Sequence, residues 1–581
     1  MTDRRAGLVV LVLAVASAIA ARLVARLALS DMAHVMDEMA YLFQAKLFAA
    51  GQLRAPEALP RAAFTTWFLE DRGSRYGIFP PGWPAVLAVG VKLGLTSWVN
   101  PALHGLTVAV LGRAARVVGG PRVSVVAALL YAASPQAVIL AASMMSHALV
   151  ALAATVVLLF AVELVLGARH ATPAWLAAGA GLALGVAAAT RPLCGTILGA
   201  FLGLAFVAAA VPTVRAGERL VALGTKAAVL ALGTLPPVAG LLAFNRALTG
   251  SALLFPQMAY FDEHLAPADL PFFQYRKGCN ALGLGPGHGC DLTVHDARHT
   301  LGNALSNLGD NMTAWLLLAC GPLLVIGVVA ALARKETRAR AALLVTVPVL
   351  SILLYALYWH GGTCFGARFY QSALPATLLV VALGATALVS FVPREALRGR
   401  ALAALLTLTM GWNAFAYART WTEIADPVWG YWAVDDRYAK LAKGWDHGRA
   451  VVMVAFGADD LYNPRLGWTA IVPDGAMWML NIRALAPLAQ NPVDLAQAGD
   501  IVFAKFHPAL VEELHRRFPD RALWLYVDHG RREKDTVTPY DPAPFASRAN
   551  DPPPDNFDGF RVEKPALPPP ESLAPPRPYW P

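Results

Sequence analysis

Two adjacent carboxylates, Asp37 and Glu38, lie a few residues beyond the first long apolar run of the chain. Acidic side chains beside a bilayer are costly to desolvate, which makes them candidates for function. As ordinary interfacial acids, they could favour the N-terminus of a helix over 39–50, where negative charge is stabilised. As a functional pair, they could accept a proton from a hydroxyl or amine that attacks an activated carbon. The dipeptide alone does not separate these two interpretations.

Two arginines at the predicted outer ends of apolar stretches could bind an anion. Arg191 precedes Pro192 in "ATRPLCG", and Arg368 lies in "GARFYQSALP". Arginine can hold a phosphate through two parallel hydrogen bonds. An interfacial arginine that extends its head group to water is the commoner case. Since ionisable residues at a membrane boundary are functional candidates, both arginines are candidates for an anion contact.

Histidine and aromatic side chains could line the same cavity. His147, in "MMSHAL", marks the point where a short outer turn re-enters the bilayer, and His34 lies close to the acidic pair. Each histidine could instead hydrogen-bond a nearby carbonyl. Tyr41 and Tyr76 could also line such a cavity, but packing against lipid head groups is equally consistent. The histidines and acids could assemble a divalent-metal site, but no ligand motif is present, so no metal is assigned.

The five cysteines include no CxxC pair and therefore no zinc or redox signature. Cys279 and Cys290 flank "NALGLGPGHG" in a predicted outer loop. They could form a disulfide in an oxidising compartment, and two free thiols are the alternative. No strand precedes these glycines and no Lys-Ser/Thr pair follows them, which excludes a phosphate-binding loop of the nucleotide-binding type.

The composition places these residues in a polytopic membrane protein. Of 581 residues, 57% are hydrophobic and 15% are charged, whereas about a quarter are charged in a typical soluble domain. The net charge of +9 comes from short basic clusters between apolar runs, a pattern typical of loops that set membrane topology. No basic face or RNA-binding motif indicates nucleic acid as a partner.

About eleven apolar stretches are long enough to cross a bilayer as helices. The first is too long for a cleaved signal peptide, so we interpret it as a retained span. The expected spans lie near 7–29, 99–118, 122–142, 147–167, 173–190, 193–211, 223–243, 312–333, 341–358, 371–391 and 401–418.

The Lys/Arg bias of the short loops predicts the orientation of these spans. With Arg4 and Arg5 in the cytoplasm, alternate loops are basic, provided that 80–95 lies at the outer interface and does not cross. We therefore expect an inner (plasma) membrane protein with a cytoplasmic N-terminus. The long loops 30–98 and 244–311, and the chain after the last span, are then extracytoplasmic.

The chain divides into three predicted parts. Residues 1–420 form the transmembrane module, 421–535 form a small extracytoplasmic α/β domain, and 536–581 form a proline-rich, extended tail. In the second part, "RAVVMVAF", "DIVFAKF" and "RALWLYV" are expected to be strands and "PALVEELHRRFP" an amphipathic helix. The fold class is thus mainly α, a polytopic helical bundle with a small C-terminal α/β domain.

The order of these motifs resembles that of the C-fold (GT-C) membrane glycosyltransferases. These enzymes include protein O-mannosyltransferases, the aminoarabinose transferase of lipid A and the bacterial proteins of glycosyltransferase family 39. The resemblance begins with the acidic pair after the first span and covers roughly 1–420. It continues through "AYLFQAKLFAAGQL", "YGIFPPGWPAVL", "SPQAVILAASMMSHALVAL", "GLALGVAAATRPLCG" and "GTCFGARFYQSALP".

This resemblance implies transfer of a sugar from a polyprenyl-phosphate donor to a lipid, protein or polysaccharide acceptor outside the membrane. Asp37 would be the base and Glu38 its support, while Arg191 and Arg368 would stabilise the departing phosphate. The metal requirement stays open, because relatives of this fold differ in it. Two alternatives remain, a noncatalytic protein of the same fold and a transporter or flippase for polyprenyl-linked sugars. Transporters tend to have repeated halves, and the sequence contains no repeat.

Overall fold

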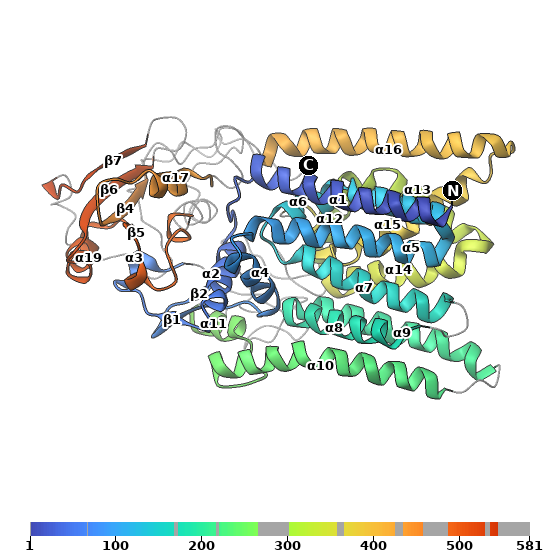
Figure 1. Cartoon of the computed structure of the whole chain (residues 1–581), viewed down its shortest axis with the longest axis horizontal. Coiled ribbons are helices and arrows are strands. Elements are labelled where there is room, and N and C mark those ends of the chain that lie inside the picture. The colour runs from blue at the N-terminus through green and yellow to red at the C-terminus, as the bar shows by residue number, and fades with distance from the viewer. Residues whose placement is uncertain are drawn as a thin grey trace.

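The computed structural model describes residues 2–66, 68–167, 172–215, 220–264, 301–356, 365–424, 434–456, 486–528 and 535–543. Within these residues, long helices form a bundle at one end of the molecule, and a small sheet with short helices lies at the other end (Figure 1). The helices α2 and α4 lie between these two parts (Figure 1).

Seven helices in the described part of the chain are long and apolar enough to cross a membrane, or eight if the bent pair α12–α13 is one span. The expected count of eleven is not confirmed. Two further apolar helices, α8 and α15, are shorter than 18 residues. Helix α5 changes direction at Gly120, where two expected spans meet and where φ is 79°. The bundle consists of α1 (Asp3–Leu27), α5 (Val99–Ala132), α6 (Pro135–Ala142), α7 (His147–Leu166), α8 (Ala174–Thr190), α9 (Pro192–Arg215), α10 (Val221–Thr249), α12 (Leu301–Trp315), α13 (Leu323–Ala333), α14 (Lys335–Ala356), α15 (Leu374–Val389) and α16 (Glu395–Ile424).

The bundle is built as an integral membrane protein is expected to be. Helices α7 and α15 are buried along most of their length, and they share one apolar core with α5 and α9. The outer helices α1, α10 and α16 instead expose large apolar side chains, among them Leu11, Leu232 and Leu408. Apolar surface of this extent is favourable only where lipid covers it.

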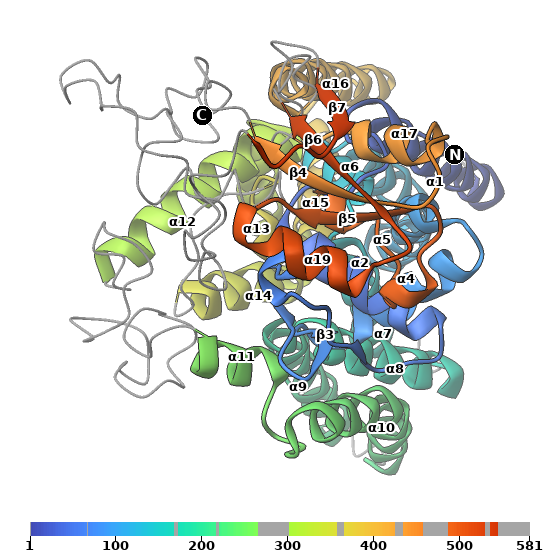
Figure 2. The same ribbon diagram turned by 90° about the vertical axis from the view of Figure 1, so that its left-hand side faces the viewer.

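The span expected near 312–333 is bent, and its crossing of the membrane stays a prediction. The chain turns by 90° between α12 and α13, after the π-helical segment η3 (Leu316–Cys320), and α12 leaves the bundle sideways (Figure 2). A π-helix leaves carbonyls without their usual partners. The Trp412 indole N–H donates to the Leu317 carbonyl at 3.0 Å, and the Ser134 hydroxyl donates to the Leu318 carbonyl at 3.0 Å. The bend occurs at Gly321, which has a φ of 61°.

The loop after α1 is folded. Helix α2 (Met36–Ala49) covers the expected 39–50, and α4 (Gly82–Lys92) lies inside 80–95. With 11 residues, α4 is about 16 Å long, about half the thickness of the hydrocarbon layer, so it is too short to cross. The remaining elements are α3 (Arg61–Phe64), η1 (Thr96–Trp98) and an antiparallel sheet in the order β1-β3-β2, formed by β1 (Ala55–Pro56), β3 (Ser74–Gly77) and β2 (Leu69–Glu70). Helix α11 (Pro256–His264) lies within 244–311, the second segment that the sequence predicts to be extracytoplasmic.

A four-stranded sheet forms the other end of the molecule, in the order β5-β4-β6-β7. Strand β4 pairs in parallel with β5 and β6, and β7 pairs antiparallel with β6. The three strands and the helix expected here are confirmed, while the domain boundary at 420 stays a prediction and falls inside α16. The elements are β4 (Ala450–Phe456), β5 (Ile501–Lys505), β6 (Ala522–Asp528), β7 (Thr536–Pro539), α17 (Arg437–Lys443) and α19 (Val511–Arg517), with short 3₁₀ turns η7 (Leu495–Gln497) and η8 (Pro508–Leu510).

The sheet is docked on the first outer loop. Met36 and Phe64 of the loop share an apolar cluster with residues of β4 and β5. Lys46, on α2, donates to the carbonyls of Ala489 at 2.7 Å and Asn491 at 3.2 Å. Burial lowers the pKa of Lys46 to about 8. The helix that carries the acidic pair is therefore fastened directly to the outer sheet.

Candidate active site

Glu38 is a buried clamp at the start of α2. Its Oε2 accepts the backbone N–H groups of His34 at 2.6 Å and Val35 at 3.2 Å. Its Oε1 accepts the backbone N–H of Met144, 106 residues away, at 2.7 Å. Burial raises the pKa of Glu38 to about 7, although the three N–H groups act in the opposite direction. The carboxylate thus ties α2 to the segment between α6 and α7.

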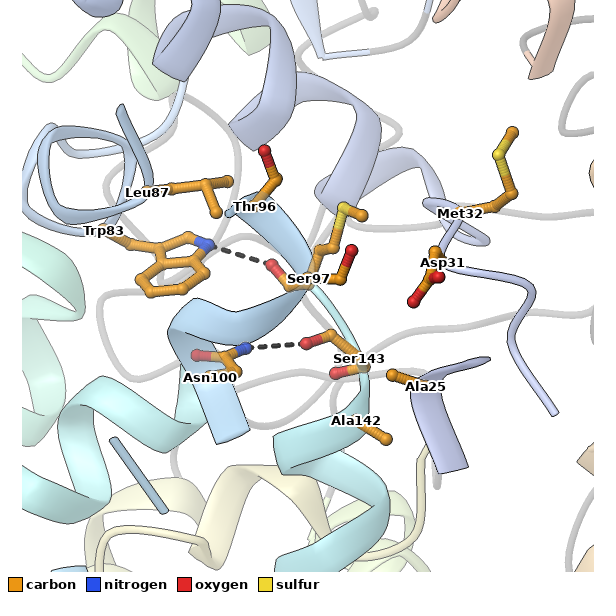
Figure 3. A pocket seen from close by; sticks show the side chains of 11 residues that line it. Ala25, Asp31, Met32, Trp83, Leu87, Thr96, Ser97, Asn100, Ala142 and Ser143 are labelled. Carbon is orange, nitrogen blue, oxygen red and sulfur yellow. Dashed lines mark hydrogen bonds between the residues drawn. The ribbon is translucent and has the colours of Figure 1, made fainter. Parts of the chain in front are cut away.

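That segment, 143–145, is held by side chains from two other elements. The Trp83 indole N–H of α4 donates to the Met144 carbonyl at 2.9 Å. The Asn100 amide of α5 donates to the carbonyls of Ser143 at 2.7 Å and Met145 at 2.8 Å. Figure 3 shows these side chains around a small pocket. None of the predicted site residues lines that pocket, so it is separate from the predicted cavity.

Asp37, the neighbour of Glu38, faces a different partner. Its Oδ2 lies 3.3 Å from Nη1 of Arg368, which begins the 3₁₀ turn η4 (Arg368–Tyr370). The two side chains are 23% and 19% exposed, so the pair lies at a water-accessible margin. The contact is longer than the roughly 2.7–2.9 Å of a typical charged N–H···O bond. The acid and the cation that the sequence predicted as site residues therefore meet.

Arg191 belongs to the same cluster. Its guanidinium carbon lies 5.5 Å from the centroid of the Phe369 ring, and that of Arg368 lies 5.1 Å from the same centroid. Burial raises the pKa of Tyr41 to about 12, Asp37 adds to the rise, and Arg191 and Arg368 oppose it. These influences require the four side chains to lie near one another.

The proline-rich turn before α4 packs closely against the end of α8, the helix that Arg191 follows. A Cβ on Gly82 would lie 2.4 Å from the Thr190 hydroxyl and 2.8 Å from the carbonyl carbon of Ala189. Only glycine therefore lets this turn approach the last residues of α8. Arg191 then caps α8, where Pro192 begins α9. The motif "FPPGWP" and the arginine motif thus belong to one packed corner.

The remaining predicted site residues differ in what they contact. His147 is the first residue of α7 and is buried near Arg191 and Arg368. Neither of its ring nitrogens has a hydrogen-bond partner among the described residues. His34 is also buried, with Nε2 at 2.8 Å from the Leu29 carbonyl, which fits a structural histidine.

Several other predictions stay untested. Tyr76 lies in β3 opposite Glu70, and its cavity-lining role stays a prediction. Cys279 and Cys290 lie outside the described residues. Where the chain is described, no three His, Cys, Asp or Glu side chains converge as metal ligands, and the metal requirement stays open.

Sequence reasoning missed two residues of the site. Phe369, whose ring lies beside both arginines, was part of a quoted motif but received no role. Gln136 also received none, although it is fully buried and contacts the turn before Arg368. An amide within the apolar run "PQAVILAA" is itself a signal, because polar residues inside membrane helices are costly.

No family model and no curated protein matches the chain. Similar solved structures include ArnT from Cupriavidus metallidurans bound to undecaprenyl phosphate, with 15% identity, a TM-score of 0.49, and coverage of 89% of this chain and 92% of that chain. The AglB oligosaccharyltransferase of Archaeoglobus fulgidus with an inhibitory peptide and dolichol-phosphate has 12% identity, a TM-score of 0.41, and coverage of 90% and 69%. The Pmt1–Pmt2 O-mannosyltransferase complex of S. cerevisiae bound to the sugar donor has 19% identity, a TM-score of 0.33, and coverage of 48% and 37%. All three are C-fold glycosyltransferases, the class that the sequence motifs resemble.

Proposed function

We propose that the protein is a membrane glycosyltransferase that moves a sugar from a polyprenyl-phosphate donor to an acceptor on the outer side. The observation that carries this proposal is the contact of Asp37 with Arg368, beside the same Phe369 ring that Arg191 faces. This cluster joins Asp37, which is 23% exposed, to the guanidinium groups of Arg191 and Arg368. Arginine is well suited to bind a phosphodiester anion through two parallel hydrogen bonds.

The proposed reaction is a single displacement with inversion. A hydroxyl or amine of the acceptor attacks the anomeric carbon of the sugar, and the bond from that carbon to the phosphate oxygen breaks. Asp37 takes the proton of the attacking group. The polyprenyl phosphate leaves with the bonding electron pair, and Arg191 and Arg368 stabilise its developing charge. Asp37 and Arg368 share one 3.3 Å contact, and a phosphate oxygen would compete with Asp37 for the guanidinium.

Glu38 has a narrower role in this proposal than a second catalytic acid. Its two oxygens already accept three backbone N–H groups, so it positions the helix that presents Asp37. His147 is better suited to touch a ligand, because it is buried beside the arginines and its ring nitrogens lack hydrogen-bond partners among the described residues. Either nitrogen could bond a sugar hydroxyl or a phosphate oxygen.

The proposed site faces outward. The N-terminus lies at the end of the bundle away from the sheet (Figure 1). Basic residues gather there, as Arg116 pairs with Asp3 at 2.7 Å and Arg340 bonds the Val118 carbonyl at 3.0 Å. Positive loops favour the cytoplasm, which would place the sheet and the Asp37 cluster outside. A site there needs a sugar that has crossed the membrane on a lipid.

The direct test is the variant Asp37→Asn, assayed in membranes for transfer from a panel of radiolabelled polyprenyl-phosphate sugars. We expect transfer to fall about 100-fold or more, the usual contribution of a positioned base. The matched control is Asp31→Asn, because Asp31 lies in the same outer loop but pairs with Arg22 and Arg26. Unchanged transfer by Asp37→Asn would remove the base assignment. No transfer by the parent protein with any donor would favour the noncatalytic or transport alternatives.

A further inference from the structure

The turn that precedes Arg368 has an unusual backbone. Phe365 has a φ of 53° and Gly366 a φ of 68°. Positive φ values are rare for residues other than glycine, such as Phe365, and persist only where the surrounding structure imposes them. The Arg368 N–H then donates to the Gly366 carbonyl at 2.9 Å. The turn therefore decides the direction in which the Arg368 side chain leaves the backbone.

One buried amide holds both sides of this turn. Gln136 lies in the first turn of α6 and has no exposed surface. Its Nε2 donates to the Phe365 carbonyl at 3.0 Å, and its Oε1 accepts the Ala367 N–H at 3.0 Å. A Cβ on Gly366 would lie 2.1 Å from that Oε1. Glycine is thus required between the two bonds, and the amide and the turn fit as a matched pair.

Apolar packing alone does not explain this arrangement. The Phe365 ring is buried in an apolar cluster with Trp83, Met145 and Leu318, which determines where the turn lies. Apolar contacts are non-directional, so they do not determine how the peptide planes of the turn are oriented. Hydrogen bonds are directional, and the two bonds of Gln136 supply that orientation.

We propose that Gln136 is a positioning residue for Arg368, holding its guanidinium where it meets Asp37 and a donor phosphate. The identity of that ligand rests on the proposed function, whereas the clamp itself rests on the contacts of Gln136. A displacement of about 1 Å in a binding group can lower activity about 100-fold. Loss of the clamp is therefore expected to act on phosphate binding through Arg368 and not through any contact of Gln136 with the ligand.

The test is a double-mutant cycle on the purified full-length protein in lipid nanodiscs, titrated with undecaprenyl phosphate. The variants are Gln136→Leu, Arg368→Ala and the two combined. Ser134→Ala is the matched control, because Ser134 is buried in the same corner and donates instead to Leu318. We expect Gln136→Leu to weaken binding about tenfold, the double variant to bind like Arg368→Ala alone, and Ser134→Ala to bind like the parent.

Each other outcome has a distinct meaning. If Arg368→Ala binds undecaprenyl phosphate as tightly as the parent, the proposed phosphate site is wrong, and the positioning role falls with it. If Arg368→Ala weakens binding but folded Gln136→Leu does not, only the positioning role is wrong. Losses that add in the double variant would also overturn it, because Gln136 would then act independently of Arg368.

A conservative variant covers the case in which Gln136→Leu does not fold. Gln136→Glu keeps an oxygen for the Ala367 N–H but loses the donor to the Phe365 carbonyl. We expect it to bind undecaprenyl phosphate about threefold to tenfold more weakly than the parent, with a higher KM for the donor and a smaller change in kcat. Binding and KM equal to those of the parent would overturn the proposal.

Discussion

Replacing Glu38 with alanine removes the acceptor of three backbone N–H groups at once. These belong to His34, Val35 and Met144, and the carboxylate that accepts them is completely buried. A buried N–H that loses its acceptor costs about 1–3 kcal/mol. Water that enters the space left by the side chain can satisfy part of this demand, so we expect a loss of about 3–5 kcal/mol in the free energy of unfolding.

Two related variants test whether this loss of stability depends on how many N–H groups keep an acceptor. Glu38→Gln keeps one oxygen for two of the three N–H groups, so we expect it to lose about 1–3 kcal/mol. Asp37→Asn keeps a polar side chain of similar size and alters a single 3.3 Å contact, so we expect a change of about 1 kcal/mol or less. The measurement is thermal unfolding in detergent at pH 6. The expected order of stability is parent and Asp37→Asn, then Glu38→Gln, then Glu38→Ala.

Sugar transfer measured on the same preparations separates the two acids. Asp37→Asn should lose activity while retaining stability, and Glu38→Gln should lose stability while its remaining folded fraction retains transfer. If Glu38→Gln unfolds at the same temperature as the parent and transfers no sugar, the carboxylate takes part in the chemistry and the clamp reasoning is refuted. An unchanged melting temperature for Glu38→Ala would refute it as well.

Two further predictions concern pH and the outer sheet. Burial raises the pKa of Glu38 from 4.5 to about 7, so its stabilising contribution is present in full below pH 4.5 and is lost as the pH rises through 7. We expect the free energy of unfolding to fall by about 3 kcal/mol over this pH range, which unfolding at a series of pH values would measure. The control Glu38→Gln should lack this dependence on pH. A free energy of unfolding that does not change with pH in the parent would contradict the prediction. Lys46→Met removes the donor to two carbonyls of the segment 486–491, so hydrogen–deuterium exchange there should rise about tenfold or more. Lys443→Met, at an exposed position, is the control, and equal exchange in both variants would show that Lys46 does not fasten the sheet.

The helices could be predicted where one local property decides them. The apolar stretch expected at 147–167 is α7 (His147–Leu166), and the one expected at 173–190 is α8 (Ala174–Thr190). Length and hydropathy are properties of the segment itself, so no distant contact is needed to recognise them. The strands of the outer sheet were recognised for the same reason, as short apolar runs such as β4 (Ala450–Phe456).

The bend within the span expected near 312–333 was not predicted, because hydropathy does not report backbone direction. The chain bends by 90° there, and the carbonyls that the π-helix releases are satisfied by Trp412 and Ser134. Both side chains come from distant parts of the sequence. The adjacent Gly321 and Pro322 were a local sign of a break, but only the partners from α16 and the start of α6 make the bend stable.

The residue types of the candidate site could be predicted from the sequence, but the contacts between those residues could not. Acids after the first span, and arginines at the ends of later apolar runs, indicate anion chemistry at a membrane surface. The contact of Asp37 with Arg368 joins residues 331 positions apart, and no local pattern specifies it. Gln136 illustrates the same limit, because its partners Phe365 and Ala367 lie more than 200 residues away.

The sequence by itself determined that this chain is a membrane-embedded helical protein carrying an acidic pair after its first apolar run, because hydropathy and charge are carried by each segment alone. Only the tertiary structure decided which acid of the pair is buried among backbone N–H groups and which faces an arginine. Neighbouring helical residues point about 100° apart, so Glu38 turns toward the Met144 N–H while Asp37 turns toward Arg368. The two carboxylates differ in what surrounds them, and those surroundings come from helices far along the chain.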